Sequence, residues 1–324
     1  MGARHIILLD PDDQTPDVAA GRAVAAVSAG SRMVFVGGST GTDDDNVHAT
    51  VLAVQEALEL CAWNASQDSG LSEDDWKVPV VLFPAGAHAL SPLADGITFM
   101  MLMNSLDRRF IIDEQVTAAL PLKEAGVSPL SMGYLVCAPG GAVGEVGKAD
   151  LFHADDTDKV REYAACAECF GFDLLYLEAG SGADTPISSN LIQAAREACA
   201  LTLLVGGGIR DGQAARRAVQ AGADWVVTGS LTEEFDDLDE LQRTLSEFIT
   251  SMRSTCDDSP AEVVHRQTPP VAAVGFSHRC WSLCLSQQLP CRGVERLGLL
   301  GPGRRPAFPA RGVRSHPITG HQDA

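Results

Sequence analysis

Lysine is scarce in this sequence, and acidic residues dominate its charge. The 324 residues include only four lysines, and the formal net charge is −19. A nucleic-acid partner needs a basic face that neutralises phosphates, so no nucleic-acid partner is expected. The acidity fits either a well-solvated surface or an adaptation to high salt, and the sequence leaves both open.

Targeting and membrane signals are also missing. No stretch of about 18 uncharged apolar residues occurs, so no transmembrane segment is expected. Residues Met1–His5 lead directly into a short apolar segment, without the hydrophobic region of a signal peptide. We therefore expect a cytoplasmic protein.

The cysteines follow no regular pairing pattern. Cys166 and Cys169 form a Cys-x-x-Cys pair inside a predicted helix with no second pair, which favours core packing over zinc or redox chemistry. A zinc site drawn from His278, Cys280, Cys284 and Cys291 has irregular spacing, so zinc is not predicted. Five cysteines lie in apolar patterns and are expected to act as small core residues: Cys61, Cys137, Cys166, Cys169 and Cys199.

Residues 1–252 alternate apolar segments with helical patterns, such as Pro16–Ala29 with Thr15 as the expected N-cap. Eight strands alternating with helices over about 250 residues are typical of a single (β/α)8 TIM barrel, an α/β fold. A doubly wound sheet is the competing architecture, but it does not usually carry functional turns on almost every strand. The expected strands are His5–Leu9, Ser31–Val36, Val78–Phe83, Gly96–Met103, Leu130–Ala138, Leu174–Leu177, Leu203–Val205 and Trp225–Thr228.

The alternating pattern ends after Met252. Residues 253–324 contain eight of the 17 prolines, with scattered arginine, serine and glycine. This composition favours a disordered tail. A shifted reading frame or another non-native addition is the alternative. We therefore expect one barrel domain over 1–252 and a low-order tail over 253–324.

Three successive strands end in glycine-rich turns. Glycine lets backbone N–H groups approach an anion, and a helix that begins soon after each turn adds the positive end of its dipole. Paired glycine turns after the seventh and eighth strands form the phosphate site of TIM barrels. The turns are Tyr176-Leu177-Glu178-Ala179-Gly180-Ser181-Gly182, Gly206-Gly207-Gly208-Ile209 and Gly229-Ser230.

A series of short motifs occurs in a fixed order over roughly residues 5–250. They are Asp10-Pro11, Gly37-Gly38-Ser39-Thr40-Gly41, Asn104-Ser105, Met132-Gly133-Tyr134, Pro139-Gly140-Gly141, the Tyr176–Gly182 run, Gly206-Gly207-Gly208-Ile209-Arg210 and Thr228-Gly229. This series closely resembles the geranylgeranylglyceryl phosphate synthase family, the prenyltransferases that make the first ether bond of archaeal membrane lipids. Other phosphate-binding barrels share the glycine turns but lack the Tyr-Leu-Glu-Ala-Gly-Ser-Gly run.

The resemblance implies substrates, a metal and binding residues. Enzymes of this family join geranylgeranyl diphosphate to the 3-hydroxyl of sn-glycerol 1-phosphate and release diphosphate. Mg²⁺ is expected at Asp10 and Ser39, whose hard oxygen atoms suit this ion. A homo-oligomer is also expected. The phosphate would lie at Gly207, Gly208, Gly229 and Ser230, and the glycerol part at Tyr176, Leu177, Glu178, Ala179, Gly180, Ser181 and Gly182.

The implied chemistry needs a base. Mg²⁺ takes up charge on the leaving diphosphate, the allylic C1 gains cation character, and the 3-hydroxyl attacks it. Glu178 is the expected proton acceptor, although it could instead only bind the glycerol hydroxyls. Asp10 could instead cap the turn before Pro11, and Tyr176 could be a barrel residue with a satisfied hydroxyl.

The C20 chain of the prenyl substrate requires an apolar groove. Some of Phe99, Met100, Met101 and Met103 on the fourth strand are expected to line it. The chain departs from relatives at Asp13, where they usually carry lysine, and Arg108 and Arg109 are candidates to supply the missing charge. Relatives also usually carry an additional N-terminal helix, so we expect that the true start lies upstream of Met1.

Two other functions compete with prenyl transfer. A phosphosugar isomerase or synthase barrel shares the glycine turns but needs a pair of catalytic carboxylates at strand ends one and five or six. Strand five ends in Pro139-Gly140-Gly141, which lacks a carboxylate. A non-catalytic phosphate-binding barrel that engages a partner is the second alternative, and the presence of Asp10, Ser39 and Glu178 together argues against it.

Overall fold

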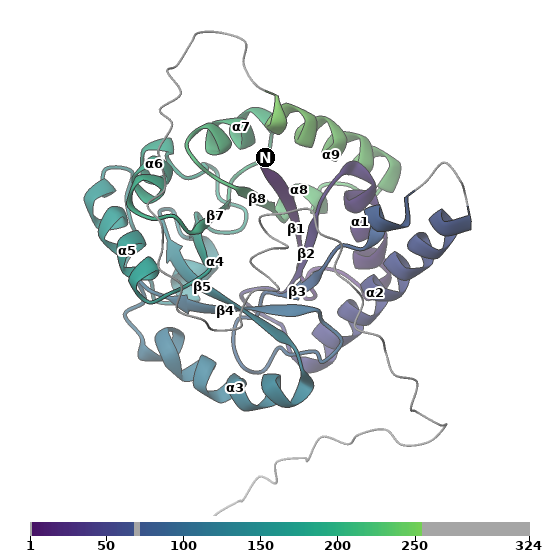
Figure 1. The fold of residues 1–324 in the computed structure, drawn as a ribbon, viewed down its shortest axis with the longest axis horizontal. Helices are drawn as coiled ribbons and strands as arrows, with labels where there is room; N and C mark the ends of the chain where they lie inside the picture. The colour runs from purple at the N-terminus through teal and green to yellow at the C-terminus, as the bar shows by residue number, and fades with distance from the viewer. Residues whose placement is uncertain (1, 68–71, 255–324) are drawn as a thin grey trace, which may run out of the picture.

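The computed structural model describes residues 2–67 and 72–254, and these residues form a closed barrel of eight parallel strands in sequence order. The predicted TIM barrel is therefore confirmed. The tail residues for which no zinc site was predicted, His278, Cys280, Cys284 and Cys291, lie outside the described residues. So does nearly all of the segment 253–324, which was predicted to be disordered. Figure 1 shows the larger helices as a ring around the strands, with α4 and α8 inside that ring.

The strands are β1 (Arg4–Leu9), β2 (Met33–Val36), β3 (Val80–Leu82), β4 (Gly96–Leu102), β5 (Ser128–Val136), β6 (Leu174–Glu178), β7 (Thr202–Gly206) and β8 (Trp225–Thr228). The helices are α1 (Pro16–Ala29), α2 (Asp44–Gln67), α3 (Glu114–Ala125), α4 (Gly141–Val146), α5 (Thr157–Cys169), α6 (Ser189–Ala198), α7 (Gly212–Gln220), α8 (Ser230–Glu233) and α9 (Leu238–Arg253). A 3₁₀ turn, η1 (Glu73–Trp76), follows α2, and a π-helical turn, η2 (Arg109–Asp113), precedes α3.

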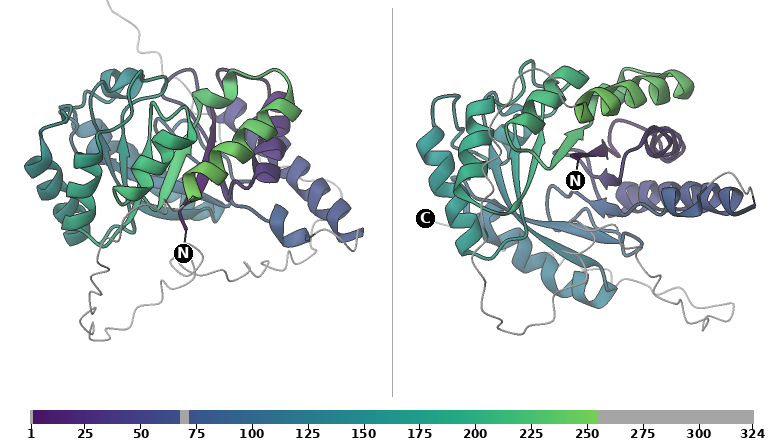
Figure 2. Two further views of the ribbon diagram at one scale, coloured as in Figure 1. Left: turned by 90° about the horizontal axis from the view of Figure 1, so that it is seen from above. Right: turned by 45° about the horizontal axis from the view of Figure 1, so that its top comes forward.

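Alternation of side chains along each strand produces two separate apolar cores. On β6, Leu174 and Tyr176 belong to the core inside the barrel, whereas Leu175 and Leu177 belong to the core between the barrel and its helices. The α9 helix packs against both α7 and α1, so the last helix closes the ring (Figure 2).

Element boundaries mostly agree with the sequence prediction. The helix α1 spans the predicted Pro16–Ala29, and the Thr15 hydroxyl accepts a hydrogen bond from the Val18 N–H, as expected for an N-cap. The strand β5 begins two residues earlier than predicted, at Ser128, despite Pro129. Proline is tolerated there because β5 pairs with β6 only from Met132 onward, so the missing N–H costs no bond to that neighbour.

The prediction that all five cysteines pack in the core was wrong for Cys166 and Cys169. Both are exposed, whereas Cys137 and Cys199 are buried and Cys61 is intermediate. The buried face of α5 is formed by Val160, Ala164 and Ala167, and the Cys-x-x-Cys pair lies off that face. No helix in the described part of the chain is long and apolar enough to span a membrane.

Candidate functional site

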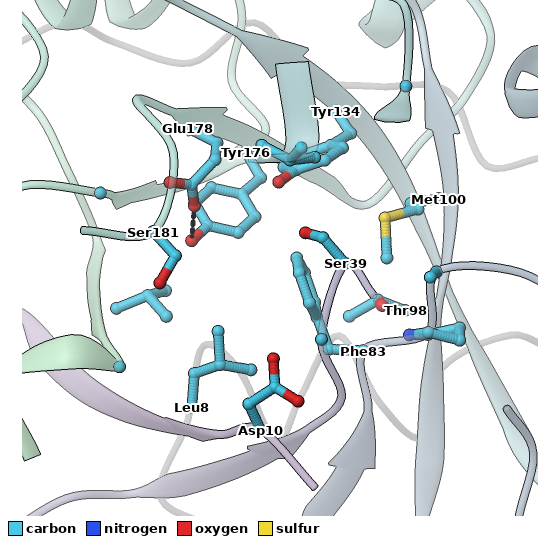
Figure 3. Close-up of a pocket in the computed structure, with 18 of the residues that line it drawn as sticks. Leu8, Asp10, Ser39, Phe83, Thr98, Met100, Tyr134, Tyr176, Glu178 and Ser181 are labelled. Carbon is cyan, nitrogen blue, oxygen red and sulfur yellow. Dashed lines mark hydrogen bonds between the residues drawn. The ribbon is translucent and has the colours of Figure 1, made fainter. Parts of the chain in front are cut away.

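A pocket lies at the carboxyl ends of the strands, where the alternation inside the barrel continues into the turns. Tyr176 points into the barrel, so Glu178 two residues later points toward the mouth. By the same alternation, Leu8 on β1 points into the barrel and Asp10, two residues later, points toward the mouth. Figure 3 shows Asp10 and Glu178 on opposite sides of this pocket.

Glu178 is held by two hydrogen-bond donors. The Tyr176 hydroxyl donates to Oε2, and the Gly180 N–H donates to Oε1 at 2.6 Å. The carboxylate is only 6% exposed. Burial raises the pKa of Glu178, and the two hydrogen bonds offset part of that rise. A fixed carboxylate with a raised pKa is well suited to accept a proton.

The glycine turn after β7 lies directly against Glu178. Gly207 and Gly208 have φ angles of +80° and +67°, which L side chains rarely adopt, and a Cβ on Gly207 would come within 2.4 Å of Glu178 Oε1. Within the described residues, no backbone hydrogen bond uses the N–H of either glycine. Both line the pocket, so these donors are available to an anion.

The turns after β6 and β8 are joined by serine side chains. Ser230 Oγ accepts a hydrogen bond from the Gly182 N–H at 3.0 Å and lies 3.1 Å from Ser181 Oγ. The helix expected to follow each turn begins soon after two of them: α8, which has four residues, begins at Ser230 after β8, and α7 begins at Gly212, shortly after the turn that follows β7. After β6, α6 begins only at Ser189, so the positive end of its dipole is not at the turn.

The predicted glycerol-binding run divides into two groups. Tyr176, Glu178, Ser181 and Gly182 line the pocket. The side chains of Leu177 and Ala179 lie in the core between barrel and helices, and the Gly180 N–H is used by Glu178. Gly207, Gly208, Gly229 and Ser230 all line the pocket, as the phosphate prediction requires.

The opposite edge of the pocket is acidic. Asp10 and Ser39 both line it, and the Asp12 N–H donates to Asp10 Oδ1 at 3.0 Å. Burial raises the pKa of Asp10 to about 6; that hydrogen bond lowers it, and the charges of Asp13, Asp12 and Glu233 raise it further. A Cβ on Gly38 would come within 1.9 Å of Asp10 Oδ2, so a side chain at this position would displace the Asp10 carboxylate.

These residues fit a hard divalent cation. The carboxylate of Asp10 and the hydroxyl of Ser39 are oxygen donors, and the surrounding negative charge favours a cation. Among the described residues, no group of three or more His, Cys, Asp or Glu side chains is arranged to hold a metal. A site with so few protein ligands suits Mg²⁺, which commonly keeps waters and substrate phosphate as its remaining ligands.

An apolar arm extends from the pocket along β4 toward α3. Of the predicted groove residues, Phe99 and Met100 line the pocket, whereas Met103 packs in the core between barrel and helices. Met101 is not a lining residue. The sequence reasoning missed further residues on this arm, which come from the loop after β3, η2 and α3: Phe83, Ala87, Leu90, Phe110, Gln115 and Ala118.

Tyr134 is a second residue that the sequence reasoning did not single out. It lies opposite Tyr176 in the β5–β6 register, and their ring centroids are 5.2 Å apart. Both rings pack near Phe83 at the base of the pocket. Its motif, Met132-Gly133-Tyr134, was the available signal, but only the strand pairing places it beside Tyr176.

Arg108 and Arg109 do not supply a free positive charge. Arg108 forms an ion pair with Asp113 at 3.1 Å, and Arg109 pairs with Glu114 at 2.5 Å. Neither arginine lines the pocket, whereas Glu114 does and also accepts a hydrogen bond from the Ala87 N–H. Both guanidinium groups are therefore neutralised locally by carboxylates.

Comparison with known proteins identifies the chain's relatives. The PcrB family matches residues 1–249. The geranylgeranylglyceryl phosphate synthase of Methanothrix thermoacetophila is 40% identical over 238 residues, covering 73% of this chain and 86% of the relative. The enzyme of that name from Methanococcoides burtonii is 37% identical over 253 residues, covering 78% and 94%.

Solved structures give the same result. The (S)-3-O-geranylgeranylglyceryl phosphate synthase from Thermoplasma acidophilum, in complex with its substrate sn-glycerol-1-phosphate, matches with a TM-score of 0.68 and 34% identity over 78% of this chain and 94% of that one. The Thermoplasma volcanium protein matches with a TM-score of 0.68 and 37% identity over the same shares. The chain therefore belongs to the PcrB family, and its resemblance to geranylgeranylglyceryl phosphate synthases covers the whole barrel.

Proposed function

We propose that this protein is a Mg²⁺-dependent prenyltransferase that joins geranylgeranyl diphosphate to the 3-hydroxyl of sn-glycerol 1-phosphate. The observation that carries the proposal is the position of Glu178. Its buried carboxylate lies between the bare glycine turn of β7 and a pocket that continues into an apolar arm. The names of the relatives support this function over a phosphosugar isomerase or a non-catalytic barrel.

The glycerol phosphate binds at the β6–β8 edge. Its phosphate accepts hydrogen bonds from the N–H groups of Gly207 and Gly208 and from the turn at Ser230. Arg210 lines the same edge; its guanidinium donates to the Gly182 carbonyl at 3.4 Å and lies 3.8 Å from Glu234 Oε1, so its charge is already partly compensated. The bound sn-glycerol-1-phosphate in the Thermoplasma acidophilum relative supports this substrate.

Glu178 then acts as the base. The bond between C1 of the prenyl chain and its diphosphate oxygen breaks, and the 3-oxygen of the glycerol forms the new ether bond to C1. The proton of the 3-hydroxyl passes to Glu178, and diphosphate leaves. The raised pKa of Glu178 favours this transfer, while Tyr176 and Gly180 hold the carboxylate in place.

The prenyl diphosphate binds on the other side of the mouth. Asp10 and Ser39 would hold Mg²⁺, which when bound supplies the positive charge that the leaving diphosphate needs. The C20 chain lies along the apolar arm, where Phe99, Phe110 and Ala118 exclude water. Homo-oligomer formation is a further expectation of the proposal.

The test is a direct assay of product formation. The full chain is incubated with radiolabelled sn-glycerol 1-phosphate and prenyl diphosphates of several lengths, with and without Mg²⁺, and the ether product is extracted and identified. We expect Mg²⁺-dependent product with the C20 donor. The matched control uses the enantiomer, sn-glycerol 3-phosphate, which should react much more slowly. Absence of product with every donor in the presence of Mg²⁺ would refute the proposal.

A further inference from the structure

Arg22 on α1 is a buried charge outside the pocket. It is only 8% exposed, and its Nη1 donates to Gln14 Oε1 at 2.9 Å. Its Nη2 donates to the Phe235 carbonyl at 3.4 Å, in the loop after α8. A buried charge is costly unless its contacts offset the loss of water, so these contacts need an explanation.

Gln14 connects Arg22 to the acidic edge of the pocket. Its Nε2 donates to the Asp10 carbonyl at 3.0 Å. That carbonyl also accepts the Asp13 N–H at 3.3 Å. The Gln14 amide is thus fixed at both ends, because its oxygen accepts from Arg22 while its nitrogen donates to Asp10.

The contacts join two loops that lie side by side at the mouth. The turn Asp10–Gln14 follows β1, and Phe235 follows α8, which begins at the phosphate-edge residue Ser230. The strands β1 and β8 pair directly, so the loops that follow them are neighbours. Arg22 therefore connects the turn at the acidic edge of the pocket to the loop that follows α8 at the phosphate edge.

We propose that Arg22 is a positioning residue, which fixes the Asp10 turn through Gln14 so that the Asp10 carboxylate points into the pocket. The inference rests on the proposed function, because it assigns Asp10 to a bound cation. The Arg22 guanidinium attracts the Glu233 carboxylate, which also lines the pocket, but it would repel a cation bound at Asp10. Positioning and charge therefore predict opposite effects for the same substitution.

Gln14→Glu separates the two explanations. A glutamate at this position can still accept from Arg22, but it cannot donate to the Asp10 carbonyl, and it adds one negative charge. Loss of positioning predicts weaker cation binding, by roughly tenfold for the loss of one hydrogen bond. Charge alone predicts tighter binding. The measurement is Mn²⁺ binding to the full chain in the presence of inorganic diphosphate, followed by electron paramagnetic resonance.

Kinetics give a second readout. In Gln14→Glu the Mg²⁺ concentration for half-maximal rate should rise about tenfold, whereas kcat at saturating Mg²⁺ and KM for glycerol phosphate should stay near wild type. Arg22→Lys keeps the charge and can make one of the two bonds, so it should show a smaller rise. Arg22→Met removes both bonds and should show a larger rise than Arg22→Lys.

Arg196→Met is the matched control. Arg196 on α6 makes the same kind of contacts, to the carbonyls of Cys199 and Leu201 and to Asp224 at 3.1 Å. Leu201 and Asp224 precede β7 and β8, at the end of the barrel away from the pocket. This variant should lower Tm without changing Mn²⁺ affinity. If its Mn²⁺ affinity falls as much as that of Arg22→Met, the loss reflects general destabilisation and the inference is wrong.

Failure of the inference is distinguishable from failure of the proposed function. A wild-type protein that forms Mg²⁺-dependent product, together with a Gln14→Glu variant whose Mn²⁺ affinity is unchanged or tighter, overturns the positioning role alone. A wild-type protein that forms no product and binds no Mn²⁺ with diphosphate overturns both.

Discussion

The two edges of the pocket are stabilised in different ways. At the β6–β8 edge, both Glu178 oxygens have donors, and Ser230 joins two turns through Gly182 and Ser181. At the β1–β2 edge, Asp10 receives one backbone donor on Oδ1 and lies near Asp12, Asp13 and Glu233. At the first edge the Glu178 carboxylate is satisfied by the protein itself and no backbone acceptor in the described residues uses the Gly207 and Gly208 N–H groups, whereas the second edge carries negative charge that is only partly compensated.

This difference agrees with the proposal that the two edges bind different ligands, an anionic substrate at one and a cation at the other. An edge whose carboxylate and backbone donors are already held in place is preorganised, and it needs no added group to bind an anionic substrate. An edge with excess negative charge becomes favourable when a cation binds, because each carboxylate then gains a partner. We therefore expect substitutions at the two edges to affect different substrates, and the following predictions test that separation.

Glu178→Gln should have the largest effect. Glutamine keeps the size of the side chain and can still accept the Gly180 N–H, but it cannot take a proton. If Glu178 is the base, kcat should fall by about 10²–10⁴-fold, while KM for glycerol phosphate changes little. The fall should lie at the low end of this range if the proton leaves late, after C1 has gained cation character.

Steady-state kinetics with both substrates saturating provide the measurement. A carboxylate that only orients the glycerol predicts the reverse pattern, with a raised KM and a largely retained kcat. A kcat near that of wild type would therefore remove the base assignment and leave Glu178 as a binding residue. Tyr176→Phe is the control, because it removes one donor to Glu178 but keeps the carboxylate.

Asp10→Asn should affect the other substrate. Asparagine can still accept the Asp12 N–H, so the turn is kept while the charge is lost. The Mg²⁺ and prenyl-diphosphate requirements should rise by at least about 10–100-fold, the range seen when a partner of a metal ligand is removed. Glycerol phosphate binding should remain nearly intact.

Calorimetric titration of each substrate checks this separation. Asp12→Asn is the matched control, because the Asp12 side chain is not among the pocket-lining residues. It should have a much smaller effect. Equal weakening of both substrates in Asp10→Asn would mean that the two edges do not act separately.

The fold and many of the pocket-lining positions were predictable because they follow from local rules. Alternation along β6 places Tyr176 and Glu178 on the inner side, and the glycine turns after β7 and β8 mark the phosphate edge. The same rules failed for Cys166 and Cys169. The buried face of α5 consists of Val160, Ala164 and Ala167 only, and the nearby Cys166 and Cys169 are as small and apolar as these residues, so the sequence did not separate the buried residues from the exposed ones.

Contacts between distant segments could not be predicted. Arg22 lies in a helix that the sequence placed correctly, but its bond to Phe235 joins residues 213 positions apart. Tyr134 reaches Tyr176 only through the β5–β6 register. A local contact was missed as well: the pairing of Arg109 with Glu114 depends on the π-helical turn η2, which no sequence pattern indicated.

The acidic edge should also respond to pH. In the metal-free protein the pKa of Asp10 is raised to about 6, so protons compete with the cation below that pH. The Mg²⁺ requirement should therefore be flat above pH 6 and rise about tenfold per pH unit below it. Mn²⁺ titrations between pH 4.5 and about 8 measure this slope directly.

Glycerol phosphate can itself titrate near pH 6, like other phosphate monoesters. Asp10→Asn separates the two titrations, because it should abolish the pH dependence of Mn²⁺ binding while leaving that of glycerol phosphate binding unchanged. A variant that keeps the wild-type slope for Mn²⁺ would show that another group controls cation binding.

The serines at the two edges offer the finest comparison. Ser230→Ala removes the acceptor for the Gly182 N–H and the contact to Ser181, so the β6 and β8 turns lose their link. KM for glycerol phosphate should rise about fivefold, within the range of about 2–13-fold that a net loss of about 0.5–1.5 kcal/mol gives, with the Mg²⁺ requirement unchanged. Ser39→Ala should do the opposite, raising the Mg²⁺ requirement by a similar factor and leaving KM for glycerol phosphate unchanged.

Each serine variant is thus the control for the other, since both replace one hydroxyl by hydrogen at the rim of the same pocket. Steady-state titrations of Mg²⁺ and of glycerol phosphate on both variants give four numbers. If the edges are separate, only one of the two parameters changes in each single variant, and the double variant shows both changes at the size seen in the single variants. If either parameter of the double variant differs from its single-variant value by more than about twofold, the serines are coupled, because the free-energy effects of independent sites add within about 0.3–0.5 kcal/mol. The proposed reaction would account for such coupling, because it brings the two substrates together between Ser39 and Ser230.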